Sequence, residues 1–241
     1  MKTIVMQPTY LPWIGYFSLI HQADYFVFLD NVQFEKQSWQ QRNRILGPKG
    51  LEWITVPVLI KRRFGQLISD VEISTSGFYE KHIKQIQQNY RRARYYDDYN
   101  TELFDCLSEY GKARSLCDLN IALIQWFSRK LTLNTHFIKA SELNAGGRRS
   151  ERLVNILKEL NSSHYISPMG SADYIKQDYS IFKNNNITVS FENYFHPEYK
   201  QVYNKFTPYA SIVDLLFNEG PGSLSILVSG QKKNFAMEEI L

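Results

Sequence analysis

The sequence predicts an α/β fold in which a mostly parallel, Rossmann-like sheet is covered by helices. Short apolar runs recur along the chain and alternate with segments whose apolar residues repeat every three to four positions. The first two runs flank one such helical segment, so the chain opens as a βαβ unit. With 44% hydrophobic residues over 241 positions, the chain can bury a sizeable core.

The first part of the chain is expected to hold four strands and one short helix. Residues 25–30 form a continuous apolar run, which is typical of a strand covered on both faces. A turn at 47–50, with two glycines and a proline, precedes the third run. The predicted elements are strands at 2–7, 25–30, 52–58 and 70–74, and a helix at 15–23.

A mainly helical insertion or subdomain is expected at about 77–131, within a single α/β domain that spans residues 1–241. Apolar residues at three- and four-residue spacing predict helices at 77–93, 100–109 and 113–130. These helices would cover the sheet.

The alternation of strands and helices then resumes. Ser150 is a candidate for capping one helix, and Gly220 with Pro221 ends the last one. The predicted elements are a strand at 135–141, a helix at 149–161, a strand–loop–helix unit at 164–175, a strand at 187–194 and a helix at 210–220.

The loop after the first strand has the composition of a pocket wall. It places aromatic side chains beside Pro8, Pro12 and Gly15, a combination that favours one particular loop shape. In parallel sheets, ligands bind in the crevice beyond the carboxyl ends of the strands. The candidate binding residues here are Gln7, Tyr10, Trp13 and Tyr16, with core packing or loop bracing as the alternative.

Polar residues follow the second strand. Asp30 and Asn31 close a buried run, where an acid needs a site or a partner. Asp30 is a candidate catalytic residue and Asn31 a candidate binding residue. The segment at 36–44 is rich in side chains that can donate hydrogen bonds to phosphate oxygens; the alternative is a solvated surface loop. Its candidate binding residues are Lys36, Arg42, Asn43 and Arg44.

His196 is the candidate general base. It follows a predicted strand and precedes Pro197, so it lies in a constrained loop; the alternative is a histidine that only bonds its neighbours. Asp214 and Asn218 lie four apart on an otherwise apolar helix and need partners. We expect a network that joins them to His196 or Tyr199, and Tyr199, Gln201, Asp214 and Asn218 complete the candidate binding residues.

Charge and cysteine content limit the function classes. Residues 36–94 contain twelve Lys and Arg against four acids, a net charge of +8, whereas the rest of the chain carries −4 and the whole chain +4. No nucleic-acid-binding motif accompanies this basic segment. This favours a phosphate-bearing small molecule, with a solvated surface as the alternative. Cys106 and Cys117 are expected to be buried thiols, and no metal-ligand spacing occurs. Without a membrane-spanning run or a signal peptide, we expect a cytoplasmic protein.

Five motifs resemble the WbqC-like family, in order over most of the chain. They begin at Met6, Ala23, Trp53, Phe195 and Ser211 and read "MQPTYLPWIGYFSLI", "ADYFVFLDNVQFEKQSWQQRNRI", "WITVPV", "FHPEYKQ" and "SIVDLLFNEG". The resemblance implies a bacterial protein of O-antigen and other surface-polysaccharide gene clusters, with an enzymatic role on nucleotide-linked sugars, aminoacyl (glycyl) transfer among the proposals.

A second resemblance concerns fold. "WIGYFSLI" and "ADYFVFLDNVQF" are arranged as in pantothenate synthetase and related nucleotidyltransferases, with Trp13 and Tyr16 at the positions of that family's two motif histidines. This implies a nucleotidyltransferase-like scaffold without the groups that steady phosphates during adenylyl transfer.

Three hypotheses follow. The first is a transferase acting on a nucleotide-linked amino sugar, with an acyl or aminoacyl donor that is free or carrier-bound. We expect no tightly bound cofactor and no metal. His196, assisted by Asp30, would deprotonate the attacking amine. The second is a non-catalytic sugar-nucleotide-binding protein of polysaccharide assembly. The third, ranked last, is a nucleic-acid binder.

Overall fold

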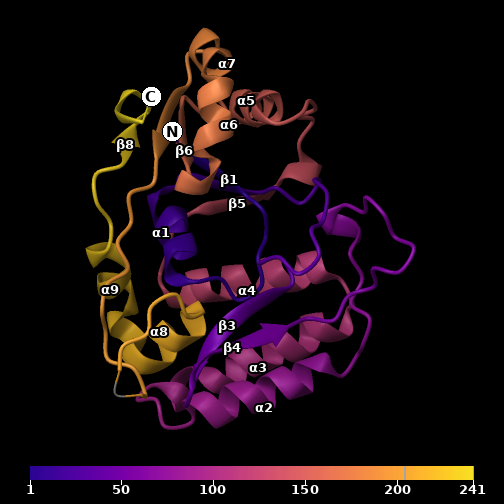
Figure 1. Cartoon of the computed structure of the whole chain (residues 1–241), viewed down its shortest axis with the longest axis vertical. Coiled ribbons are helices and arrows are strands. Elements are labelled where there is room, and N and C mark those ends of the chain that lie inside the picture. Colours follow the sequence, from indigo (N-terminus) through magenta and orange to yellow (C-terminus); the bar gives the residue numbers. More distant parts are fainter. Residues whose placement is uncertain (204, 241) are drawn as a thin grey trace.

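A computed structural model of the chain, which describes residues 1–203 and 205–240, contains the predicted α/β architecture (Figure 1). Its main sheet has six strands in the order β5-β2-β1-β6-β7-β8. All neighbouring pairs are parallel except β7 with β8. The strands are β1 (Lys2–Met6), β2 (Tyr25–Phe28), β5 (His136–Lys139), β6 (His164–Ser167), β7 (Thr188–Phe191) and β8 (Phe235–Ala236). The predicted fold class is confirmed.

The strand order reverses at β1. The chain builds β2 and β5 on one side of β1 and then crosses to place β6 on the other side. Carboxyl ends of parallel strands separate at such a switch point, which leaves a crevice for ligands. The loop that follows β1 lies at this point.

Helices cover both faces of the sheet. Ile4, Phe26 and Phe28 pack in one hydrophobic cluster with α1 (Ile14–Gln22) and α4 (Leu116–Lys130). Val5 and Val27 face the opposite cluster, which contains residues of α5 (Ser150–Glu159), α6 (Ala172–Gln177) and α7 (Tyr179–Asn184). Alternate residues of each strand therefore point to opposite cores, as expected for a sheet buried on both faces.

The segment predicted as a third strand of the sheet belongs to a separate hairpin. β3 (Arg42–Gly47) pairs antiparallel with β4 (Gly50–Thr55), and Gly50 turns the chain with φ of 111°. The strand predicted at 52–58 is therefore present as β4, but it ends at Thr55 and lies outside the main sheet, and β3 was missed. The predicted strand at 70–74 is also absent from the described structure, which has a 3₁₀ turn at Ile68–Asp70 followed by single bridges.

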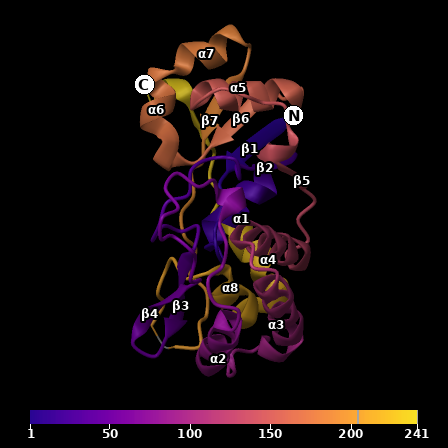
Figure 2. The same cartoon turned by 90° about the vertical axis from the view of Figure 1, so that its right-hand side faces the viewer.

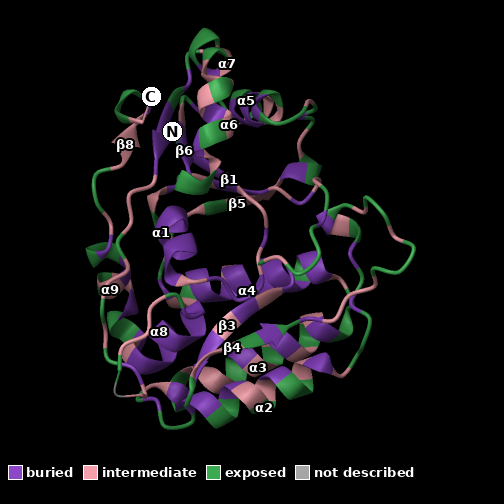
Figure 3. Cartoon of the chain, viewed as in Figure 1, coloured by how far each residue is buried: buried purple, intermediate pink, exposed green. Residues whose placement is uncertain are grey.

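Three long helices and α8 (Ile212–Glu219) surround this hairpin. α2 (Phe78–Tyr90), α3 (Tyr96–Lys112) and α4 occupy the three segments predicted as helical. Figure 2 shows β3, β4, α2 and α3 at one end of the molecule and α5 to α7 at the other. Figure 3 shows α4 and α8 largely buried and the outward sides of α2 and α3 exposed. The helical block thus shares one continuous core with α1 and β1.

Smaller elements complete the chain. α9 (Ser223–Ser229) follows α8, and four further 3₁₀ turns lie at Ala140–Glu142, Met169–Ser171, Gly220–Gly222 and Met237–Glu239. The prediction that Ser150 caps its helix was wrong. Arg149 occupies the cap position, and Ser150 Oγ donates to Asp178 (2.8 Å). None of the described helices combines the length and apolarity needed to cross a membrane.

Candidate functional site

The loop between β1 and α1 is fixed from three directions. The Tyr10 amide donates to the Trp39 carbonyl (2.9 Å), and the Ile212 amide donates to the Pro12 carbonyl (2.8 Å). A side-chain amide, Asn120 Nδ2, donates to the Pro8 carbonyl (3.2 Å). Leu11 is fully buried at a φ of 42°, a left-handed conformation that a non-glycine residue keeps only where its surroundings impose it. The loop therefore holds one rigid shape.

This loop forms one wall of an aromatic cavity of about 290 Å³. Four of its nine lining residues are aromatic, one guanidinium supplies positive charge, and an amide and hydroxyl groups can form hydrogen bonds. The aromatic cavity is lined by Met6, Thr9, Pro12, Trp13, Tyr16, Trp39, Asn43, Arg44 and Tyr209.

A second cavity of about 410 Å³ adjoins the first at the switch point of the sheet. The two share Met6, Thr9 and Trp39. Gln7 and Gln40 line this switch-point cleft, and Gln40 Nε2 donates to Gln7 Oε1 (2.9 Å). Its remaining lining residues are Val5, Leu29, Glu35, Ser38, Leu153, Pro168, Ser171 and Tyr174.

Two tryptophans and two arginines stack at the mouth of the aromatic cavity. The ring centroids of Trp39 and Trp53 are 5.5 Å apart, and both rings are about half exposed, at 48% and 47%. The Arg42 guanidinium lies 4.3 Å from the Trp53 ring, and the Arg44 guanidinium lies 5.6 Å from both rings. Stacking on these faces holds the cations in place without neutralising them.

A buried polar network lies behind the cavity wall. The fully buried Asp214 carboxylate accepts hydrogen bonds from Tyr199 Oη (2.8 Å) and Gln201 Nε2 (2.7 Å). Asn218 Nδ2 donates to the Asp214 carbonyl (2.7 Å). Burial raises the pKa of Asp214 to about 6, although the hydrogen bonds from Tyr199 and Gln201 lower it. The network expected around Asp214 is thus present, but its members line neither cavity.

His196 connects this network to the cavity by ring stacking. Its imidazole is stacked on Trp13 (centroids 6.0 Å apart, 22° between planes) and on Tyr199 (6.2 Å, 21°). Nδ1 lies 2.9 Å from the Pro197 carbonyl, which can only accept, so Nδ1 carries the proton. Nε2 is buried and has no hydrogen-bond partner among the described residues. Burial lowers the pKa of His196, so the ring is neutral near pH 7 and Nε2 is a free acceptor behind the Trp13 wall.

Asp30 and Asn31 hold the 3₁₀ turn after β5. The Asp30 carboxylate accepts from the Ser141 amide (2.9 Å) and from Ser141 Oγ (2.6 Å). Asn31 Nδ2 donates to the Ala140 carbonyl (3.2 Å), and Arg152 donates to the Asn31 carbonyl (2.9 Å). Both residues lie at the carboxyl end of β2, but neither lines either cavity, and Asp30 is not hydrogen-bonded to His196.

Comparison with known proteins places the chain in a family. The sequence matches the WbqC-like protein family over residues 7–226. This chain belongs to the WbqC-like family. It is also 32% identical over 220 residues to a Mycobacterium tuberculosis protein described as uncharacterized protein Rv1507c, covering 91% of this chain and 94% of that relative. No solved structure matches it.

The remaining predicted residues of this WbqC-like protein divide into wall and support. Tyr16 lines the aromatic cavity, and its hydroxyl donates to the Gln7 carbonyl (3.0 Å). Asn43 also lines it, and Nδ2 donates to the Tyr10 carbonyl (3.0 Å). Tyr10 itself is fully buried, and its hydroxyl is 2.8 Å from His82 Nδ1. Lys36 lies apart, in a groove beside the exposed Phe64.

The His82 ring belongs to the core. Nε2 faces the Thr55 carbonyl (3.1 Å), so Nε2 carries the proton and Nδ1 accepts from Tyr10. Burial lowers the pKa of His82 to about 4, which keeps it neutral. Tyr10 thus supports the loop of the WbqC-like chain from inside.

Sequence reasoning missed several residues that face the cavities. Trp39, Tyr209 and Glu35 were not selected, although Trp39 and Arg44 lie in one motif; Trp53, which stacks on Trp39, was not selected either. The available signal was the two tryptophans close in sequence to Arg42 and Arg44, since Trp is enriched at binding interfaces. Within the described residues, no group of three or more His, Cys, Asp or Glu side chains is placed to hold a metal ion.

Proposed function

We propose that this WbqC-like protein binds a nucleotide-linked amino sugar across the aromatic cavity and the switch-point cleft, and transfers an acyl or aminoacyl group to the sugar amine in surface-polysaccharide assembly. The observation that carries the proposal is Arg44. Its guanidinium lines the aromatic cavity, and its buried Nε has no hydrogen-bond partner within the described part of the chain. A preorganised guanidinium of this kind suits the oxygens of a diphosphate.

The rings around Arg44 suit a planar base or the apolar face of a sugar. Trp13 and Tyr209 lie with centroids 5.5 Å apart, and Trp39 lines the same cavity. Aromatic walls with a few fixed polar groups are the usual construction of small-molecule sites. The aromatic cavity is thus the proposed place for the nucleotide.

The switch-point cleft supplies groups that suit sugar hydroxyls and an amine. Gln7, Ser38 and Ser171 offer both donors and acceptors, and Glu35 offers a carboxylate without a side-chain partner among the described residues. Because the cleft shares Trp39 and Thr9 with the aromatic cavity, one ligand can span both.

The proposed reaction needs a base. The amine nitrogen attacks the carbonyl carbon of an activated ester or thioester donor, the C–N bond forms, and the bond to the donor oxygen or sulfur breaks. The proton lost from nitrogen passes through the base to the leaving group. His196 is the proposed base because its Nε2 is a neutral, unpartnered acceptor beside Trp13. Glu35 is the alternative, since it lines the cleft directly. Asp30, engaged by Ser141, assists neither.

Non-catalytic sugar-nucleotide binding is the second candidate. It is favoured by the position of Trp13, which stands between the His196 ring and the aromatic cavity. In that case the cavities deliver a ligand to another protein and change no bond.

Binding is tested with UDP-glucosamine, UDP and free glucosamine by isothermal titration calorimetry. Arg44→Gln is expected to weaken UDP-glucosamine and UDP by about tenfold or more and glucosamine by less than twofold, because only the first two carry a diphosphate. Arg94→Gln is the matched control, since Arg94 also stacks on an aromatic ring (5.2 Å from Tyr95) but lines neither cavity. Equal losses in the two variants would refute the assignment.

The transferase part is tested separately, with acyl thioesters and aminoacyl donors added to the UDP-glucosamine complex. A new amide on the sugar, lost by about a hundredfold in His196→Gln with unchanged UDP-glucosamine affinity, supports His196 as base. The same loss in Glu35→Gln assigns the base to Glu35. Binding without turnover for any donor leaves the non-catalytic candidate.

A further inference from the structure

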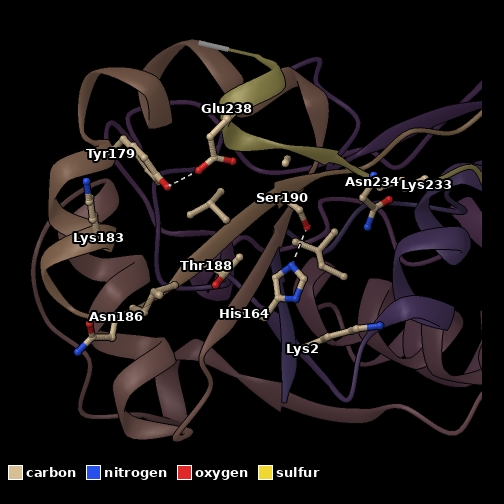
Figure 4. Close-up of a pocket in the computed structure, with 14 residues that line it drawn as sticks. Lys2, His164, Tyr179, Lys183, Asn186, Thr188, Ser190, Lys233, Asn234 and Glu238 are labelled. Atoms are coloured by element: carbon tan, nitrogen blue, oxygen red, sulfur yellow. Dashed lines mark hydrogen bonds between the residues drawn. The ribbon is translucent and has the colours of Figure 1, made fainter.

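A third cavity, of about 580 Å³, lies at the amino end of the sheet, opposite the candidate functional site (Figure 4). Lys2, His164 and Thr188 are direct register partners across β1, β6 and β7, and all three line it. Five residues of β1 separate this end from the loop after β1, roughly 15 Å at the rise of a strand. This amino-end cavity is therefore a separate place on the molecule.

Positive charge surrounds the amino-end cavity. Three exposed lysines, Lys2, Lys183 and Lys233, line it against one acid, Glu238. Figure 4 shows Lys183 at one side of the cavity and Lys2 and Lys233 at the other. Glu238 is already engaged by the Tyr179 hydroxyl (3.4 Å). None of the three lysines has an acidic partner among the described residues, so their charge is available to an anion.

Neutral hydrogen-bonding groups accompany the lysines. His164 Nε2 lies 2.7 Å from Ser190 Oγ, which leaves Nδ1 for another partner. Asn234 Nδ2 donates to Gln22 Oε1 (2.9 Å), whereas Asn234 Oδ1 is buried without a partner in the described structure. Burial, and then the charge of Lys2, lower the pKa of His164. The cavity thus combines cations for a phosphate with amides that suit hydroxyl groups.

We propose that the amino-end cavity binds a small hydroxylated phosphate ester, such as a sugar phosphate. The unpaired charges of Lys183 on one side and of Lys2 and Lys233 on the other favour the phosphate, and Asn234 and Thr188 contact hydroxyl groups. The volume is within the range of small-molecule sites. This site is independent of the proposed function, because it shares no lining residue with the aromatic cavity or the switch-point cleft.

The test uses the full chain, with inorganic phosphate and glucose 1-phosphate as probes and the His164 ring signals in NMR spectra as readout. We expect saturable shifts at His164 and a higher pKa of its imidazole in the bound protein, because a nearby anion favours the imidazolium. Glucose 1-phosphate is expected to bind several-fold more tightly than inorganic phosphate. Equal affinities would overturn the sugar part, and the absence of a saturable shift at His164 would overturn the site.

Lysine variants distinguish this site from the basic surface in general. Lys183→Gln and Lys233→Gln are each expected to weaken glucose 1-phosphate several-fold, because each removes one of the three unpaired positive charges around the cavity. Lys232→Gln is the matched control: Lys232 is equally exposed and adjacent in sequence, but it does not line the cavity. We expect less than a twofold effect there. A loss in Lys232→Gln as large as in Lys233→Gln would overturn the proposal.

Discussion

The two ends of the parallel sheet carry cavities of opposite construction. At the carboxyl end, the Arg44 guanidinium lies 5.6 Å from both the Trp39 ring and the Trp53 ring, beside a loop held by backbone hydrogen bonds. At the amino end, Lys2, Lys183 and Lys233 extend from exposed positions without acidic partners among the described residues. Both ends present cations, but only at the first are the cations held against aromatic rings.

The two ends differ in how much side-chain conformational entropy is lost when a ligand binds. A lysine side chain gives up about 2 kcal/mol of rotamer freedom when a ligand immobilises it, whereas a guanidinium already stacked on rings loses less on binding. The carboxyl end is therefore suited to selective binding, and the amino end to a looser, more adaptable site. The buried Asp214 network supports the wall at the carboxyl end through Tyr199 and His196, which stack in turn behind Trp13.

The largest expected effect comes from removing that support. Asp214→Ala leaves the Tyr199 hydroxyl and the Gln201 amide buried without their acceptor, so we expect the free energy of unfolding in urea to fall by about 3 kcal/mol at pH 7. In the folded fraction, UDP-glucosamine should bind more weakly, while glucose 1-phosphate at the amino-end cavity should be unaffected.

The control for this variant is Asp118→Ala. Asp118 forms an exposed ion pair with Lys139 (2.9 Å), and its loss is expected to cost less than about 1 kcal/mol. If both variants lose the same stability, the Asp214 network is not what supports the cavity wall.

A smaller effect is expected from crowding Trp13. A Cβ on Gly15 would overlap the Trp13 indole, so Gly15→Ala must displace the ring. We expect it to lower the free energy of unfolding by about 2 kcal/mol and to weaken the binding of UDP-glucosamine. Gly77→Ala, where a Cβ meets open space beside α2, is the matched control and should change stability by less than about 0.5 kcal/mol.

A double variant isolates the Trp13 contact. In a Trp13→Ala background the overlap is gone, so adding Gly15→Ala should be neutral or slightly stabilising, since alanine is the better helix former. A full 2 kcal/mol loss in that background would mean that the glycine is needed for some other reason.

Most of the main sheet was predictable because its strands are buried on both faces. The runs beginning at Lys2, Tyr25 and His164 are apolar in sequence and lie in the sheet. The hairpin was not predictable, because β4 has a strand pattern that does not identify its partner. That partner, β3, begins with Arg42-Asn43-Arg44 and reads as a polar loop.

The candidate site was predictable only where local chemistry decides the position. Trp13 and Arg44 line the aromatic cavity as their surroundings in the sequence suggest. The position of Asp30 after the second strand correctly predicted the edge of the sheet at which it lies. Its carboxylate is bound by Ser141, 111 residues away in the sequence, and so does not line either cavity. Trp39 was missed because only the folded loop brings it against Thr9 and Trp13. That the residues lining these cavities act on a substrate stays a prediction.

A pH-dependent effect is expected at Glu192, which directly follows β7. Burial raises the pKa of Glu192 to about 7, and Oε1 is buried without a partner among the described residues. The folded protein therefore favours the protonated acid, and this contribution to stability, complete below pH 4.5, is lost as pH rises to 7 and above. Glu192→Gln should raise the free energy of unfolding by about 2 kcal/mol at pH 8 and change it little at pH 4. An equal gain at both pH values would exclude the ionisation as its cause.

The smallest expected effect tests the comparison between the two ends directly. Arg42→Lys keeps a positive charge beside Trp53 but removes the planar group that lies 4.3 Å from the ring, so the Trp53 ring, which also faces Arg44, loses a stacked guanidinium rather than a charge. We expect UDP-glucosamine to bind about two- to fivefold more weakly, the measured range of a cation–π contact at an exposed site. The reverse exchange, Lys233→Arg at the amino-end cavity, should change glucose 1-phosphate affinity by less than twofold, because Lys233 has no cation–π contact with a ring of the described residues. If the two exchanges have equal effects, stacking does not distinguish the two ends, and charge alone accounts for both.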